Sequence, residues 1–318
     1  MAEAKKKASV RLPRLVEGHW RRDYPFRSNF FERPGGGYLH YLDEGHGPPV
    51  LMVHGNPSWS FMYRSLIKAL APDYRCLVLD HLGMGISSRP KGGAYGFRLA
   101  DRLNDFSDFV ASLSLSGPAH VVVHDWGGPI GLGWAGANPA RVASLTVMNT
   151  GLRAPEGYRW PLELSLFRKT GFLGRALAKR FNAFLWGYLN RGSVRPLPPA
   201  VAQGYLAPYS LPVHRRAIGR FVGDVPLAPD HPSHSALMAV DRDFDGLKNA
   251  PTLLVWGLRD FVFTPAFLAD FRARRPEAQV LALPRAGHLL LEDEPEKIAA
   301  AVRQFLGQAQ WPAGPEVP

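Results

Sequence analysis

The sequence has one cysteine, Cys76, among its 318 residues, and no long uninterrupted apolar run. A single cysteine forms no intrachain disulfide and is a poor metal site on its own, so we expect a packed, inert thiol. No apolar stretch approaches the roughly 20 residues that a membrane-spanning helix needs. The basic start MAEAKKKASVRLPR is not followed by the apolar core of a signal peptide. We therefore expect an intracellular, cytoplasmic protein.

Acidic residues are scarce, with 27 Asp and Glu against 38 Lys and Arg and a formal net charge of +11. A basic balance raises nucleic acid as a partner, so the position of the excess matters. Residues 151–223 contain twelve Lys or Arg but only Glu156 and Glu163. The interleaving of these basic residues with apolar ones favours a membrane-surface or lipid-facing segment over a nucleic-acid-binding one. An ordinary solvated basic face is the alternative. The interleaved apolar residues are Phe167, Phe172, Phe181, Phe184, Leu185 and Trp186.

Short β-type runs alternate with helical patterns along most of the chain. This alternation predicts an α/β fold with a mostly parallel central sheet and helices on both faces. Helices are expected over residues 60–70, 98–115, 129–137, 264–273 and 295–306. The expected strands lie in YLHYLDEG, PVLMVHG, RCLVLDH, AHVVVHD, SLTVMNT, PTLLVWG and QVLALPR.

The alternation stops near residue 150 and resumes near residue 249. Between these points the pattern is helical and is interrupted by proline-rich turns, which predicts an inserted helical cap over 151–248. Residues 25–150 and 249–318 would form the body, and residues 1–24 an N-terminal tail. In open sheets of this class, ligands bind beyond the carboxyl ends of the strands. Candidate catalytic residues should therefore follow strand ends.

Asp125 occupies the position that a serine takes in the G-x-S-x-G elbow of hydrolases. It follows the β-type run AHVVVH and precedes WGGPIG, in which Gly127 and Gly128 permit a tight turn into a helix. The dipole of that helix would favour an ionised carboxylate, which can attack without prior deprotonation. A helix N-cap is the alternative role for this aspartate.

Asp260 and His288 complete a candidate catalytic triad. Asp260 follows the strand in TLLVWG, and His288 follows the last strand and precedes the helix opened by EDEPE. The chain order nucleophile, acid and histidine is that of the α/β-hydrolases. Asn149 holds the rival position for the acid, but its amide cannot serve as the anion.

Asn56 and Trp126 are the candidate anion-binding residues. In this fold, the loop after the strand in PVLMVHG and the residue after the nucleophile supply the backbone N–H groups of the oxyanion hole. The side chains of Asn56 and Trp126 add two uncharged N–H donors for a leaving anion. His54 is expected to support this loop. Ordinary turn chemistry ahead of Pro57 is the alternative for Asn56.

An aspartate nucleophile indicates substitution at carbon. A serine that attacked a saturated carbon would form an inert ether, whereas a carboxylate forms an ester whose carbonyl can later be cleaved. His288, oriented by Asp260, would activate the water for that step. The sequence contains no metal-ligand cluster, phosphate loop or dinucleotide fingerprint, so we expect no cofactor.

The motifs HGNPSW, DHLGMGIS, HDWGGPIG, WGLRD and GHLLLEDEPE resemble those of the haloalkane dehalogenases over about the whole body of the chain. The cap sequences RFNAFLWG, LPPAVAQGYLAPYS and RFVGDVPLAP are similar to a narrower branch, the β-lactone decarboxylases of bacterial long-chain olefin biosynthesis. That resemblance implies conversion of a cis-3,4-dialkyl-oxetan-2-one to a cis-alkene and carbon dioxide. It also implies an extended apolar groove and a basic cap that docks to a membrane or a pathway enzyme.

Three alternatives stay open at this stage. Hydrolytic dehalogenation would use the same residues, with a halide held by Asn56 and Trp126. An epoxide hydrolase would need cap tyrosines as proton donors, for which Tyr158, Tyr188, Tyr205 and Tyr209 are available, although Asn56 counts against it. A protein that only binds ligand or serves as a scaffold is the last, and such proteins generally lose a catalytic residue.

Overall fold

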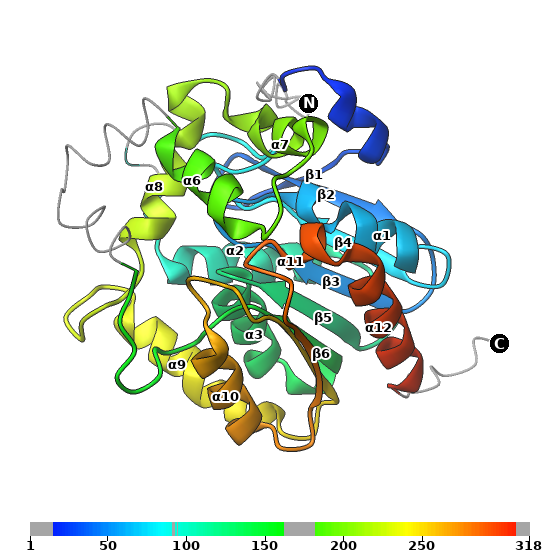
Figure 1. Ribbon diagram of the computed structural model, residues 1–318, viewed down its shortest axis with the longest axis vertical. Helices are drawn as coiled ribbons and strands as arrows, with labels where there is room; N and C mark the ends of the chain where they lie inside the picture. The colour runs from blue at the N-terminus through cyan, green and yellow to red at the C-terminus, as the bar shows by residue number, and fades with distance from the viewer. Residues whose placement is uncertain (1–14, 91–92, 94, 162–181, 310–318) are drawn as a thin grey trace, which may run out of the picture.

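A computed structural model describes residues 15–90, 93, 95–161 and 182–309 of the chain. The described residues form an eight-stranded sheet in the order β1-β2-β4-β3-β5-β6-β7-β8 (Figure 1). The strands are β1 (Asn29–Glu32), β2 (Tyr38–Glu44), β3 (Pro49–Val53), β4 (Arg75–Leu79), β5 (Ala119–His124), β6 (Val142–Met148), β7 (Thr252–Gly257) and β8 (Gln279–Leu283).

Strands β1 and β2 run antiparallel to their neighbours, and every pair from β4 to β8 is parallel. All residues of β3, β5 and β7 are buried, as expected of strands covered on both faces. The predicted fold class is confirmed, and each of the seven expected runs contains a strand. The sequence analysis missed β1, a four-residue edge strand in which half-buried and exposed residues alternate.

Helices cover both faces of the sheet. Helix α1 packs against α12 on one face, while α3 contacts α2 and α9 on the other. The predicted helices agree with the observed ones to within a few residues at their ends, and the first begins as a 3₁₀ turn, η2 (Ser60–Tyr63). The body helices are α1 (Arg64–Leu70), α2 (Leu99–Ser112), α3 (Gly127–Ala137), α10 (Pro265–Arg274), α11 (Leu290–Asp293) and α12 (Pro295–Gln308).

The segment predicted as a cap contains four described α-helices between β6 and β7. Three of them, α6, α7 and α8, gather at one end of the molecule, whereas α9 packs against α3 of the body (Figure 1). Among the interleaved apolar residues, Phe167, Phe172 and Phe181 lie outside the described residues, Leu185 is buried and Trp186 is 47% exposed. The helices are α6 (Ala183–Gly192), α7 (Pro199–Leu206), α8 (Arg216–Gly223) and α9 (His234–Phe244), and the short turns are η4 (Ala207–Tyr209), η5 (Pro212–Arg215) and η6 (Asp245–Leu247).

The N-terminal segment is anchored over part of the predicted tail. A 3₁₀ turn, η1 (His19–Asp23), buries Trp20 to 1% exposure. Its ring lies 5.9 Å from the ring of Trp59 and 6.0 Å from that of Phe61. The prediction of a tail over residues 1–24 is therefore wrong at Trp20, which packs against the body. Burial stabilises the fold because the tryptophan side chain is large and apolar.

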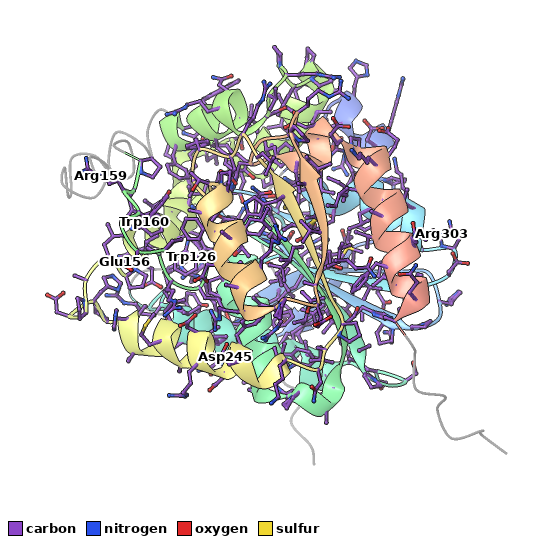
Figure 2. All side chains as sticks on the ribbon, turned by 60° about the horizontal axis from the view of Figure 1, so that its bottom comes forward. Trp126, Glu156, Arg159, Trp160, Asp245 and Arg303 are labelled. Carbon is purple, nitrogen blue, oxygen red and sulfur yellow. The ribbon has the colours of Figure 1, made fainter. Side chains whose placement is uncertain are left out.

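The other two expectations drawn from composition concern the cysteine and membrane spans. Cys76 is buried in β4, and burial raises the pKa of its thiol to about 12, which keeps it protonated and unreactive. No described helix is long and apolar enough to cross a membrane. Figure 2 shows Arg159 and Arg303 on opposite outer sides of the molecule.

Replacing Trp20 tests the N-terminal anchor. We expect Trp20→Ala to lower the free energy of unfolding by about 3–5 kcal/mol, because it leaves a cavity among aromatic rings. Urea unfolding followed by circular dichroism measures the change. Val16→Ala is the control, since Val16 is 52% exposed and its truncation should cost little. A Trp20→Ala protein as stable as this control would contradict the anchor.

Candidate active site

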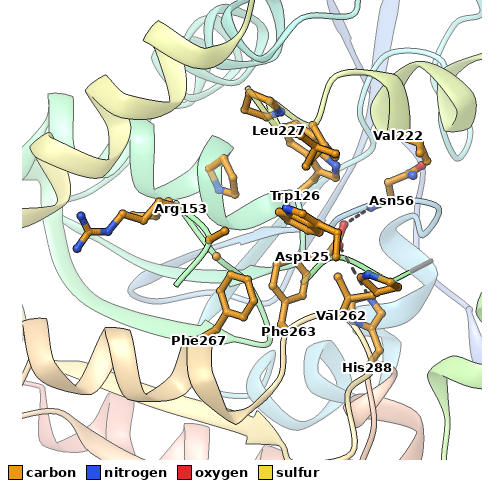
Figure 3. Close-up of a pocket in the computed structure, with 18 of the residues that line it drawn as sticks. Asn56, Asp125, Trp126, Arg153, Val222, Leu227, Val262, Phe263, Phe267 and His288 are labelled. Carbon is orange, nitrogen blue, oxygen red and sulfur yellow. Dashed lines mark hydrogen bonds and ion pairs between the residues drawn. The ribbon is translucent and has the colours of Figure 1, made fainter. Parts of the chain in front are cut away.

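The parallel strands bring the predicted site residues to one edge of the sheet. Asn56 follows β3, Asp125 and Trp126 follow β5, Asp260 follows β7, and His288 follows β8. Figure 3 shows Asn56, Asp125, Trp126 and His288 around one pocket. The structure thus gathers all the residues that the sequence analysis selected, and their catalytic roles are taken up below as part of the proposal.

Asp125 lies in a sharp turn between β5 and α3. Its φ is 51°, in the left-handed region that non-glycine residues adopt with strain. The turn is held by Thr150, whose hydroxyl donates to the Asp125 carbonyl at 2.6 Å. It also needs Gly127, because a Cβ there would lie 1.9 Å from the Val53 carbonyl oxygen. These contacts present the Asp125 carboxylate at the N-terminal end of α3, where the helix dipole favours an anion.

The two carboxylate oxygens of Asp125 have different surroundings. Oδ1 accepts the backbone N–H of Asn56 at 2.6 Å, and the backbone N–H of Trp126 also donates to the carboxylate. Oδ2 lies 3.8 Å from His288 Nε2. Gly55 permits Oδ1 to come close to the Asn56 backbone, since a Cβ at position 55 would lie 2.1 Å from Oδ1. One oxygen is therefore held by the backbone, and the other lies near the histidine.

His288 is held by a chain of hydrogen bonds. Its Nδ1 donates to Asp260 Oδ2 at 2.8 Å. The same oxygen accepts the Asn149 side-chain amide at 2.9 Å, and Asp260 Oδ1 accepts the backbone N–H of Val262 at 2.7 Å. Because an ionised carboxylate only accepts, Asp260 fixes the proton on Nδ1 and turns Nε2 toward Asp125. The sequence analysis had treated Asn149 only as a failed acid, and the structure gives it the role of a donor to the acid.

Burial and charge set the protonation of the pair. Burial raises the pKa of the Asp125 carboxyl to about 6, although the His288 charge and the backbone N–H groups act to lower it. Burial lowers the pKa of His288, but the charge and hydrogen bond of Asp260, with the charge of Asp125, outweigh it and leave the pKa raised. The two groups therefore favour an ion pair near neutral pH.

A cavity of about 630 Å³ lies over Asp125, between the ends of the strands and the segment predicted as a cap. This volume suits a small-molecule ligand. Its wall is largely apolar, and the polar groups of Asn56, Asp125, Trp126 and His288 meet at one place on it. The apolar and aromatic lining includes Leu152, Trp160, Phe184, Tyr188, Val222, Leu227, Leu237, Met238, Phe263 and Phe267.

The two side-chain donors both reach this cavity. Asn56 and Trp126 line it, and the Asn56 side-chain oxygen is buried without a partner among the described residues. The Arg102 guanidinium lies 5.4 Å from the centre of the Trp126 ring, and the Phe221 ring packs edge-on against the same indole. These two contacts orient the indole. His54 supports the Asn56 loop as predicted, since its Nδ1 donates to the Gly55 carbonyl at 2.8 Å.

The loop that carries His288 is joined to the segment predicted as a cap through two acidic residues that the sequence analysis did not single out. Glu292 accepts both terminal nitrogens of Arg64, at 2.6 and 2.7 Å, and the Tyr205 hydroxyl at 2.7 Å. Asp293 accepts the Ser193 hydroxyl at 2.6 Å and the Gly287 N–H at 2.8 Å. The motif LLLED contains both acids, but their partners are distant in sequence.

The described residues contain no group of three or more His, Cys, Asp or Glu side chains arranged to hold a metal ion. The expectation that the chain needs no cofactor remains a prediction.

The fold and the residues at its strand ends define a class of enzyme. A family model for the alpha/beta hydrolase fold matches residues 48–295, and the chain belongs to this family. Within it, the chain is 38% identical over 288 residues to a cis-3-alkyl-4-alkyloxetan-2-one decarboxylase of Shewanella oneidensis, which covers 90% of each chain. It is 32% identical to haloalkane dehalogenase 2 of Mycobacterium tuberculosis, over 89% of this chain and 96% of that one.

The crystal structure of haloalkane dehalogenase DbeA from Bradyrhizobium elkani is also similar to this chain. The two superpose with a TM-score of 0.77 at 26% identity, over 88% of this chain and 98% of the other. Both the sequence and the structural comparisons thus agree with the family resemblance drawn from the motifs.

The protonation of Asp125 predicts a pH dependence. Asp125 is the predicted nucleophile, and a carboxylate attacks only when it is ionised, so its alkylation by a bromoalkane should slow below pH about 6, by about tenfold per pH unit. Intact-protein mass spectrometry measures the adduct. In His288→Ala the inflection should move to higher pH, because the His288 charge lowers the pKa of Asp125. A rate that stayed constant from about pH 5 to 8 in both proteins would count against Asp125 as the nucleophile.

Proposed function

We propose that this enzyme converts a cis-3,4-dialkyl β-lactone to a cis-alkene and carbon dioxide, with Asp125 as nucleophile. The observation that carries the proposal is the Asp125 carboxylate, whose Oδ1 is held by the Asn56 backbone N–H while the residue lines a largely apolar cavity of about 630 Å³. The relative named as a decarboxylase is 38% identical, against 32% for the dehalogenase, which ranks the lactone first.

The first step opens the ring. Oδ2 of Asp125 bonds to C4, the ring carbon that carries the ring oxygen, and the C4–O bond breaks with its electron pair on oxygen. The leaving group is the carboxylate on C3. Attack at the carbonyl carbon is the alternative, but it expels a far more basic alkoxide. Uncharged donors such as the Asn56 amide and the Trp126 indole are suited to the weakly basic carboxylate.

The second step releases the products. The bond between C3 and the carboxylate carbon breaks, and its electron pair forms the C3=C4 double bond. The C4–Oδ2 bond breaks at the same time and returns its pair to Asp125, so no proton or water is consumed. Inversion at C4 followed by anti elimination turns a cis-lactone into a cis-alkene. In this scheme His288 and Asp260 keep the nucleophile ionised and oriented.

Hydrolytic dehalogenation is the second candidate, favoured by the similarity to the Mycobacterium tuberculosis and Bradyrhizobium elkani proteins. Asp125 would form an alkyl ester, Asn56 and Trp126 would hold the halide, and His288 would activate water. The ester carbonyl oxygen would then be Oδ1, which already accepts the backbone N–H of Asn56. This candidate uses the same residues, so only substrates separate the two.

Epoxide hydrolysis ranks third. Among the four tyrosines considered for it, the hydroxyls of Tyr158, Tyr205 and Tyr209 donate to Val262, Glu292 and Ser58 respectively. A binding-only or scaffold role ranks last, because the acid, the histidine and the nucleophile retain a hydrogen-bonded or facing geometry.

We also propose that the cap meets a membrane surface or a pathway enzyme, as a peripheral protein on the cytoplasmic side. A dialkyl lactone is apolar and would reach the enzyme from such a surface. Trp186, Leu211 and Val213 of the cap are 47%, 54% and 56% exposed, within the segment that holds the basic excess. Each basic residue near an anionic membrane contributes about 1 kcal/mol. A nucleic-acid partner is not part of the proposal.

Two substrate classes distinguish the candidate functions. The purified enzyme, given a synthetic cis-dialkyl β-lactone, should release cis-alkene and carbon dioxide, measured by gas chromatography. Asp125→Asn should reduce the rate by about 10³-fold or more while the protein stays folded, since the amide is a poor nucleophile of the same shape. Rapid bromide release from bromoalkanes with no alkene from any lactone would reverse the ranking in favour of the dehalogenase.

Vesicle flotation tests the membrane proposal. The enzyme should bind vesicles that contain phosphatidylglycerol but not neutral phosphatidylcholine vesicles, and added salt should weaken the binding. The double variant Leu211→Ser, Val213→Ser should bind less. Val280→Ser is the control, because Val280 is 39% exposed on β8 of the body. Equal binding by all three proteins would show that these two side chains do not contact lipid.

A further inference from the structure

Tyr188 is a buried tyrosine on the cavity wall. It comes from cap helix α6, lines the cavity over Asp125 and is 6% exposed. Its ring meets the His288 ring edge-on, with centroids 5.4 Å apart and planes at 81°. A cap residue therefore lies directly against the catalytic histidine.

The hydroxyl of Tyr188 has no hydrogen-bond partner among the described residues. An unpaired buried hydroxyl destabilises a protein, since it loses water and gains nothing in return. The three other tyrosines of this region differ, because each hydroxyl donates to a protein oxygen. Phenylalanine at position 188 would keep the ring contact without this penalty, so the retained oxygen calls for a function.

The surroundings keep this hydroxyl protonated. Burial raises the pKa of Tyr188 well above its ordinary value, and the negative charges of Asp125 and Asp260 raise it further. Tyr188 is consequently a neutral O–H donor over the whole range in which Asp125 is ionised.

We propose that Tyr188 is a further catalytic residue, whose hydroxyl donates a hydrogen bond to the carboxyl group of the lactone as the ring opens. This inference rests on the proposed function. A lactone carries two oxygens, and the carboxylate formed from it has more lone pairs than the Asn56 amide and the Trp126 indole can fill. A haloalkane offers one leaving atom, which those two donors already receive. Tyr188 thus favours a substrate with a carboxyl group over a halide.

Tyr188→Phe tests the proposal with three measurements. The kcat for alkene formation from the lactone should fall by about 10- to 100-fold, as expected for loss of a hydrogen bond to a charged group. The single-turnover burst of bromide from a bromoalkane should fall at least several-fold less than the lactone kcat, because Asn56 and Trp126 receive the halide. The Tm should be equal to or above that of the parent, because the variant removes an unpaired buried hydroxyl.

Tyr209→Phe is the matched control. Tyr209 is fully buried, but its hydroxyl donates to the Ser58 carbonyl and accepts the Gly85 N–H, and it does not line the cavity. Its loss should lower the Tm and leave the kcat for the lactone nearly unchanged. The two variants thereby separate loss of a substrate contact from loss of a structural one.

Each other outcome has a defined meaning. An unchanged lactone kcat in Tyr188→Phe would overturn the proposal while leaving the decarboxylase function intact. An equal fall in lactone and bromoalkane rates, with a lowered Tm, would assign Tyr188 a structural role and also overturn it. A parent enzyme that makes no alkene from any lactone would instead refute the proposed function, and this inference with it.

Discussion

The short hydrogen bond from the Asn56 backbone N–H to Asp125 Oδ1 is the contact on which the site depends. It makes the two oxygens of one carboxylate unequal, so that Oδ1 is held by the backbone while Oδ2 lies 3.8 Å from His288 Nε2. The contact requires glycine at position 55 and a left-handed backbone at Asp125. The strain at the elbow is balanced by the buried strands on either side, which cannot shift without opening the core.

Much of the fold was predictable because the central strands are buried on both faces. Such strands tend to contain continuous apolar runs, as PVLMV in β3, VVV in β5 and LLVW in β7 do. Strand β1 gave no comparable pattern, since two of its four residues are exposed. The anchoring of Trp20 was also missed, because nothing local to that residue indicates that the distant Trp59 and Phe61 will receive its ring.

In the candidate site, too, features with a local sequence pattern were predictable and contacts between distant residues were not. Asp125, Asp260 and His288 were predictable because each follows a strand and parallel strands end at one edge of the sheet. The amide of Asn149 bonded to Asp260 and the pairing of Glu292 with Arg64 and Tyr205 depend on contacts between residues far apart in the chain. Tyr188 was visible only as one of four candidate tyrosines. Its hydroxyl, unlike those of the other three, has no hydrogen-bond partner among the described residues, and only the structure shows this.

The acids Glu292 and Asp293 have a consequence for engineering the enzyme. They follow His288 in the chain, yet their partners Tyr205 and Ser193 belong to the inserted helical segment. That segment is therefore not an interchangeable module, although it lies between two strands and looks easy to exchange. A chimaera that imported the insertion of a relative without these hydroxyls would leave two half-buried carboxylates short of a donor each and loosen the loop that carries His288. Grafts designed to change the substrate range must carry both halves of this junction together.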